Sequence, residues 1–321
     1  MTEYREPDLS RVRTVSLTER ANKVDPSLLA APPAEDRSFS AFLRSLPQQL
    51  AASSLLALTD AIVTGTRARG RTCMLLVGGH VVKTGLGPLF VEWIRRGVVS
   101  HVALNGAAAI HDYELAAYGG TSEDVEAGLA DGTFGMAEET GRDMNSAAIT
   151  AASEDRGLGE GLARHLASRS SLAHREASLL LAAHDHKVPI TVHAAIGADI
   201  IHQHPSVDGA ALGATTYRDF RRLAGSMPAL HQGGVVLNLG SAVILPEVFL
   251  KALTVCRNVE GGRPTGLIAA DFDMVRHYRP RVNVVERPTR AAGGRGFLFT
   301  GHHELLLPLL VWAVVEGLEG R

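Results

Sequence analysis

The sequence predicts an α/β protein whose mostly parallel sheet is doubly wound, with helices on both faces. Short apolar runs of the kind that buried strands need alternate along the chain with segments of helical periodicity. Small-residue turns follow the first of these runs, as the carboxyl ends of ligand-binding strands require. No internal repeat or interior linker stands out, so we expect an N-terminal arm, 1–37, and a single domain, 38–321, that begins with a helical extension.

Length, charge and cysteine content exclude several classes of protein. The 321 residues can bury one large core or two modest ones, and a net charge of −2 offers no basic surplus to nucleic acid. The only cysteines, Cys73 and Cys256, lie in apolar segments and predict neither a disulfide framework nor a thiolate metal cluster. No apolar run is long enough to cross a bilayer. We expect a cytoplasmic protein with no membrane or nucleic-acid partner.

The two ends of the chain point to an oligomer. Residues 1–37 alternate charge with proline and small residues, so we expect this arm to form little core and to contact a neighbouring subunit. Apolar spacing predicts helices from Ser38 and again over 55–62. The helix opened by 300–304 is too apolar to lie exposed, which predicts burial in the domain or at a subunit interface. We therefore expect a homo-oligomer that acts on a small molecule.

The first strand–turn–helix unit predicts a cofactor site. Residues 74–77 form an apolar strand, and Gly78-Gly79 allow a tight turn where a side chain would collide. A helix over 86–93 and a strand over 98–104 follow, and this strand ends at Asn105-Gly106-Ala107. Two small-residue turns at successive strand ends are where open α/β sheets hold nucleotides, although G-x-G-x-x-G is absent. The alternative is that these glycines serve packing alone.

Further strands are predicted over 188–193, 235–239, 267–272 and 282–285. The first of them leads into the most polar loop of the chain, residues 197–209. Imidazoles and carboxylates at strand ends can orient ribose hydroxyls or a polar substrate. The residues that we expect to bind substrate are Asp112, Asp199, His202 and His204.

Two later turns repeat the pattern of the first unit. Asp208-Gly209 predicts a turn whose carboxylate faces the ligand, and 238–241 repeats the Asn-Gly pattern of Asn105-Gly106. Lys83 follows the first turn, where an ammonium group can neutralise a pyrophosphate or form an imine with a carbonyl. A simple salt bridge is the alternative for Lys83.

The order of these turns resembles that of the deoxyhypusine synthase family. The matching segments are Gly78–Leu86, Leu104–Ala108, Val207–Gly213 and Val235–Val243, within a match that covers roughly residues 70–285. The resemblance implies a Rossmann-like sheet that binds NAD between the subunits of a tetramer. From the turns and the resemblance together, the expected cofactor-binding residues are Gly78, Gly79, His80, Thr84, Gly85, Asn105, Gly106, Ala107, Asp208, Gly209, Asn238, Gly240 and Ser241.

The catalytic segment of that family is not matched here. The family carries its catalytic lysine in a Ser-Trp-Gly-Lys segment near the C-terminus, whereas the last lysine of this chain is Lys251. In that region this chain instead contains Gly301-His302-His303-Glu304. We therefore expect no modification of a protein lysine. The prediction is a transferase- or lyase-type NAD-dependent enzyme that acts on a small amine- or hydroxyl-bearing substrate through transient hydride transfer.

The predicted chemistry rests on a few side chains, and two other functions stay open. The catalytic candidates are Lys83, His193, His302, His303 and Glu304. A metal-dependent hydrolase or lyase is the first alternative, with ligands from the loops of His193, His202 and His204 and of His302 and His303. A nucleotide-binding protein without catalysis is the second alternative. We place no metal ion in the main prediction.

Overall fold

The computed structural model describes residues 4–70 and 72–320, and its contacts divide the chain into the units Met1–Ser53 and Ser54–Arg321. The first unit contains the 3₁₀ turns η1 (Leu9–Arg11) and η2 (Pro26–Leu28) and the helix α1 (Phe39–Ser45). None of these three elements has a buried residue. The expected boundary between residues 37 and 38 stays a prediction.

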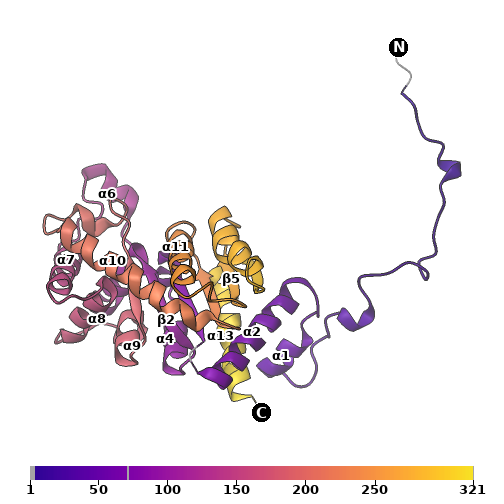
Figure 1. The fold of residues 1–321 in the computed structure, drawn as a ribbon, viewed down its shortest axis with the longest axis horizontal. Coiled ribbons are helices and arrows are strands. Elements are labelled where there is room, and N and C mark those ends of the chain that lie inside the picture. Colours follow the sequence, from indigo (N-terminus) through magenta and orange to yellow (C-terminus); the bar gives the residue numbers. More distant parts are fainter. Residues whose placement is uncertain (1–3, 71, 321) are drawn as a thin grey trace. The chain divides into compact units, whose positions relative to one another are not determined.

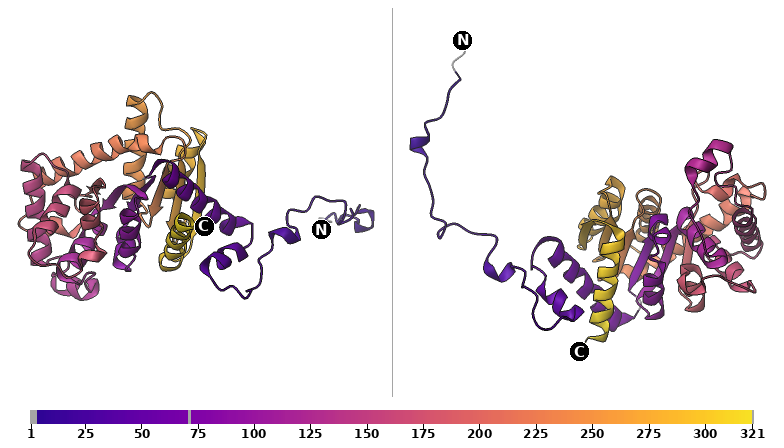
Figure 2. Two further views of the ribbon diagram at one scale, coloured as in Figure 1. Left: turned by 90° about the horizontal axis from the view of Figure 1, so that it is seen from below. Right: turned by 180° about the vertical axis from the view of Figure 1, so that it is seen from behind.

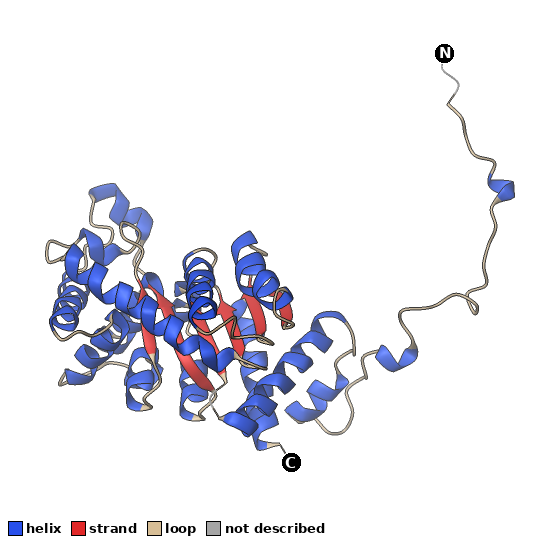
Figure 3. Cartoon of the chain, in the orientation of Figure 1, coloured by secondary structure: helices blue, strands red, loops and turns tan. Residues whose placement is uncertain are grey.

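The second unit is built on one six-stranded parallel sheet (Figure 3). Its strands lie in the order β3-β2-β1-β4-β5-β6, and all five neighbouring pairs are parallel. The strands are β1 (Cys73–Val77), β2 (Val99–Asn105), β3 (Ile190–His193), β4 (Val235–Leu239), β5 (Ile268–Asp273) and β6 (Arg295–Thr300). This strand order is the doubly wound, Rossmann-like arrangement, so the predicted fold class is confirmed.

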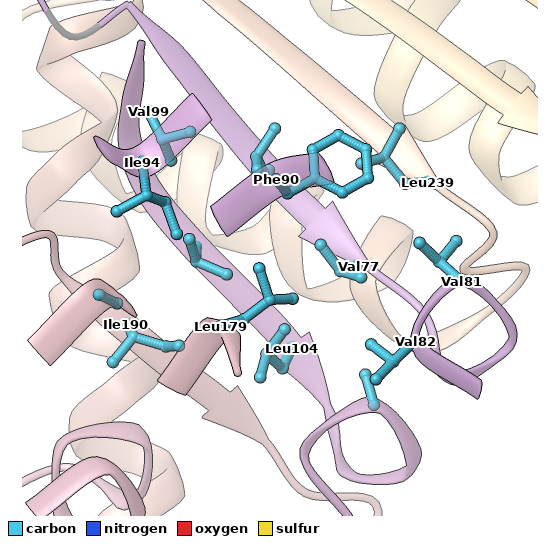
Figure 4. Packing of buried hydrophobic residues seen from close by; sticks show 14 of the residues in the cluster. Val77, Val81, Val82, Phe90, Ile94, Val99, Leu104, Leu179, Ile190 and Leu239 are labelled. Carbon is cyan, nitrogen blue, oxygen red and sulfur yellow. The ribbon is translucent and has the colours of Figure 1, made fainter. Parts of the chain in front are cut away.

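Helices cover both faces of the sheet (Figures 1 and 2). This is the usual arrangement for parallel strands, which are buried on both sides. On one face, the larger core joins the sheet to α2, α4, α5, α9 and α13, and Figure 4 shows Val77, Phe90 and Leu239 within it. On the other face, a second core is formed with α10, α11 and the π-helical turn η6. The α8 helix contacts β3, and α7 packs on α8.

The helices run between the strands in the alternating order that the sequence predicts. The helices that precede β3 are α2 (Leu50–Arg69), α3 (Gly79–Lys83), α4 (Gly87–Arg95), α5 (Gly106–Tyr118), α6 (Val125–Asp131), α7 (Glu138–Ser153), α8 (Leu158–Ser168), η3 (Arg175–Ala177) and α9 (Leu179–Asp185). After β3 they are η4 (Ile200–Gln203), α10 (Gly209–Ser226), η5 (Met227–Leu230), α11 (Ile244–Val259), η6 (Pro280–Glu286), α12 (Arg287–Arg290) and α13 (His303–Glu319).

One predicted strand is wrong, and one strand was not predicted. Residues 282–285 lie in η6, where Val284 and Val285 are buried in the second core. β-branched residues favour strands, but here packing against β5 and α11 outweighs that preference. The sixth strand of the sheet is instead Arg295–Thr300, which pairs with β5.

One face of the C-terminal helix α13 is buried within its own unit, whereas Leu305 and Trp312 of the same helix are exposed. Leu307, Leu310 and Val314 pack into the larger core. Across residues 4–70 and 72–320, no helix is both long enough and apolar enough to cross a membrane.

Candidate functional site

The strand order defines where a ligand would lie. The chain winds outward from β1 to β3, then crosses back so that β4 lies beside β1 on its other side. Open α/β sheets bind ligands outside the carboxyl ends of the strands at this switch point. The turns after β1 and β4 meet here, because a Cβ built on Gly78 would lie 2.2 Å from the carbonyl oxygen of Gly240. Gly240 also has a φ of +64°, which favours glycine.

On the β4–β6 side of the switch point, the buried His303 presents an unused ring nitrogen. Its Nε2 lies 3.1 Å from the carbonyl oxygen of Phe272, and a carbonyl only accepts, so Nε2 donates. In the neutral ring Nδ1 then carries the lone pair, and this buried atom has no hydrogen-bond partner among the residues that the structure describes. The neutral ring of His303 is therefore held in one tautomer, and its Nδ1 is a hydrogen-bond acceptor without a described partner.

His80 connects the two sides of the switch point. Its ring lies 5.4 Å from that of His303, measured between centroids. Burial lowers the pKa of His80, and the charges of His303 and Lys83 lower it further. Lys83 also lowers the pKa of His111, after burial as the main cause, so its ammonium group is close to both rings. Lys83 is exposed and forms no ion pair with any described residue.

Two carboxylates at the end of β5 were not predicted from the sequence. Burial raises the pKa of Asp271 to about 7. The hydrogen bond that Asn238 Nδ2 donates to Asp271 Oδ1 at 2.8 Å acts in the opposite direction and lowers this pKa. Asp273 is also buried, and residues two apart in a strand face the same way. The signal was present in the sequence, since Asp271-Phe272-Asp273 places two acids at the carboxyl end of an apolar strand.

On the β1–β3 side, the structure contains a pocket of about 600 Å³. Lys83, His111, Glu114 and Asp199 line it, together with apolar side chains. Glu114 is fixed by Thr140 Oγ1, which donates to it at 2.8 Å, and by Thr121 Oγ1. The volume falls within the roughly 300–1,000 Å³ of small-molecule sites, so this pocket can hold a ligand about the size of a nucleoside.

Several predicted cofactor residues lie at the strand ends but use their side chains locally. Asn105 Oδ1 accepts from Ala108 N at 2.9 Å and caps α5. Thr84 Oγ1 donates to the carbonyl of His80, and Ser241 Oγ accepts from Leu245 N at 3.2 Å. Asn238 is buried and donates to the Ser241 carbonyl at 3.0 Å. These side chains are engaged within the protein, which leaves ligand contacts to the backbone and to neighbouring side chains.

Asp112, predicted to bind substrate, is a structural residue. The side chain is 1% exposed, and its oxygens accept from Ser178 Oγ at 2.6 Å, Leu179 N at 2.7 Å and Leu180 N at 3.1 Å. These contacts satisfy the N-terminal amides of α9, which otherwise lack partners. With both oxygens engaged inside the core, Asp112 does not reach the pocket.

The histidines that could have formed a metal site point to different partners. His193 is buried and its Nε2 lies 3.0 Å from Thr191 Oγ1, and burial lowers its pKa to about 3. His204 Nδ1 contacts Ser206 Oγ at 2.7 Å, whereas His202 Nδ1 accepts from Gly197 N at 3.3 Å. Within the described ranges, no three His, Cys, Asp or Glu side chains are grouped to hold a metal ion.

His302 and Glu304, the other catalytic candidates, lie beside His303 at the start of α13. Both are exposed, and His302 Nδ1 is 3.6 Å from Glu304 Oε1. Both residues are adjacent to His303 in the sequence, but neither side chain is buried at the switch point.

Asp208, predicted to bind cofactor, caps α10. Its Oδ1 accepts from Ala210 N at 2.8 Å and from Ala211 N at 2.9 Å, and the residue is exposed. We expect Asp208→Ala to lower the free energy of unfolding by about 1 kcal/mol, because two helix amides lose their acceptor. Asp208→Asn should keep wild-type stability, since asparagine caps equally well. Urea denaturation measures both; an alanine variant as stable as the parent would contradict the capping role.

Comparison with known proteins identifies similar folds but no family. No family model and no curated protein matches this sequence. A conserved protein from Methanococcus maripaludis S2, named as a candidate LOR/SDH protein, is 13% identical, with a TM-score of 0.48, over 89% of this chain and 74% of that one. AgrE, solved with ornithine and NAD+, is 15% identical, with a TM-score of 0.48, over 86% of this chain but only 34% of AgrE. A protein from Entamoeba histolytica named as a candidate deoxyhypusine synthase is 10% identical, with a TM-score of 0.47, over 87% and 93% of the two chains. Likenesses at this level assign neither family nor activity.

Proposed function

We propose that this chain is an NAD-dependent enzyme that acts on a small amine- or hydroxyl-bearing substrate through transient hydride transfer. The observation that carries the proposal is the strand order, with a nucleoside-sized pocket on one side of the switch point and the buried side chains of His303 and Asp271 on the other. In sheets of this order a dinucleotide lies across the switch point, with its two halves on opposite sides.

The residues present fit such a cofactor. The pocket beside β1 and β2 has room for the adenosine half, and Lys83 offers a cation without a competing ion pair in the described chain. Gly78 and Gly240 allow the turns after β1 and β4 to approach closely at the switch point. When bound, NAD would supply a hydride acceptor and donor, which no side chain of the protein can replace.

The side chains over β4–β6 would manage the protons of such a reaction. His303 Nδ1 would accept a hydrogen bond from a ligand group that reaches it, because its Nε2 is committed to Phe272. Asp271, whose pKa is raised by burial to about 7, can take up or release a proton near neutral pH. His80 lies beside His303, and burial lowers the pKa of His80, so these groups suit a substrate that loses or gains a proton together with a hydride.

Direct binding tests this proposal. We expect NAD to release or absorb heat on titration and to raise the melting temperature, because binding to the native state alone adds stability. At 100 times the dissociation constant the gain is about 2.7 kcal/mol. A protein that shows neither heat nor a thermal shift with NAD or NADP would refute the proposal. The homo-oligomer, with the arm on a neighbouring subunit, stays a prediction.

A further inference from the structure

The second strand of the sheet ends without the acidic side chain that NAD-binding sheets of this order place there. In such sheets an Asp or Glu near the end of the second strand accepts hydrogen bonds from the adenosine ribose. Here β2 ends at Asn105, whose Oδ1 already accepts from Ala108 N. The next residues are Gly106 and three alanines, so no side chain on the adjoining turn of α5 can bind a hydroxyl.

A carboxylate from a different loop lies at this place. Asp199 belongs to the loop after β3, yet a Cβ built on Gly106 would lie only 2.1 Å from its Cγ and Oδ2. Any side chain at residue 106 would therefore collide with this carboxylate. Because the N-terminal end of a helix favours negative charge, the first turn of α5 suits a carboxylate at this position.

The carboxylate of Asp199 is both fixed and available. Its Oδ2 accepts from Ala195 N at 2.9 Å, which holds the group in place. Its Oδ1 has no hydrogen-bond partner in the part of the chain that the structure describes, and the residue lines the 600 Å³ pocket. One oxygen is thus anchored on the protein while the other remains free for a ligand hydroxyl.

We infer that Asp199 binds the adenosine ribose hydroxyls and makes the protein select NAD over NADP, an inference that rests on the proposed function. A carboxylate accepts from a 2′-hydroxyl but repels a 2′-phosphate. The rest of the pocket acts in the same direction, since Glu114, Glu123 and Glu139 also line it. Lys83 and His111 are the basic residues of that lining, and burial lowers the pKa of His111.

Titration calorimetry of NAD and NADP against three proteins tests the inference. We expect the parent to bind NAD at least tenfold more tightly than NADP. Asp199→Asn keeps the side-chain volume and the acceptor for Ala195 N but removes the charge, so the preference should fall about tenfold. Glu138→Gln is the matched control, because it removes the same charge from an exposed side chain outside the pocket lining. Its preference should equal that of the parent.

The outcomes separate this inference from the proposed function. A parent that binds neither dinucleotide refutes the proposed function itself. A parent that binds NAD, with the same NAD-to-NADP ratio in Asp199→Asn, overturns the role of Asp199 alone. An equal change in Glu138→Gln would also overturn it, because the effect would then be one of overall charge. Melting temperatures check folding, and Asp199→Ser provides a second neutral variant should the asparagine protein unfold.

Discussion

Asp219→Ala is expected to lower the free energy of unfolding by about 2–6 kcal/mol. Asp219 is fully buried in α10, and its Oδ2 accepts from Gly159 N at 2.7 Å and from Val192 N at 2.8 Å. One carboxylate oxygen thus joins α10 to the start of α8 and to the edge strand β3. Alanine would leave two buried amides without an acceptor, at about 1–3 kcal/mol each.

Asp219→Asn is the matched control, and its effect should depend on pH. The amide oxygen can accept both hydrogen bonds without burying a charge. Burial raises the pKa of Asp219 from 3.8 to about 7, so the native state holds a proton that the unfolded chain releases between these values. This stabilising contribution is present near pH 4 and is lost as the pH rises towards 7.

Urea denaturation at about pH 5 and about pH 8 distinguishes the two variants. The stability of Asp219→Asn relative to the parent, measured as the free energy of unfolding, should be greater at the higher pH, because only the parent then carries the buried charge. The alanine variant should be much less stable than the parent at both values. If alanine cost no more than asparagine, the two amide hydrogen bonds would not be holding β3 and α8.

The sheet could be predicted because its inner strands carry a simple signal. β1, β4 and β5 are buried on both faces, and continuous apolar runs such as residues 73–77 are what such strands require. The signal fails at the edge of the sheet. In β6 only Phe299 is buried, whereas 282–285 is a more apolar run that forms η6. Which of the two segments pairs with β5 depends on the space left beside it, and local sequence does not contain that information.

The site was predictable in position more than in residue roles. Turns after parallel strands meet at one edge of the sheet, so locating Gly78, His80 and Gly240 needed only the strand assignment. The role of Asp112 depends on Ser178, which lies 66 residues further along the chain. That pairing is set by the packing of α9 on α5, which periodicity does not reveal.

Gly78→Ala is expected to destabilise the protein by about 1–3 kcal/mol and to weaken NAD binding. The added methyl group would lie 2.2 Å from the carbonyl oxygen of Gly240, which is a backbone atom and cannot rotate away. The turns after β1 and β4 must therefore move apart, at the cost typical of an overpacked core. That displacement falls at the switch point, where the proposed cofactor would lie.

Gly213→Ala provides the opposite expectation with the same chemical change. Gly213 lies inside α10, is exposed, and a Cβ there would have nothing within 4 Å. Alanine should stabilise this helix by roughly 1 kcal/mol and leave NAD affinity unchanged. Urea denaturation and NAD titration of both variants give the comparison. A Gly78→Ala protein with the stability and NAD affinity of the parent would show that the two turns are not held in contact, and a ligand site built on their close approach would have to be abandoned.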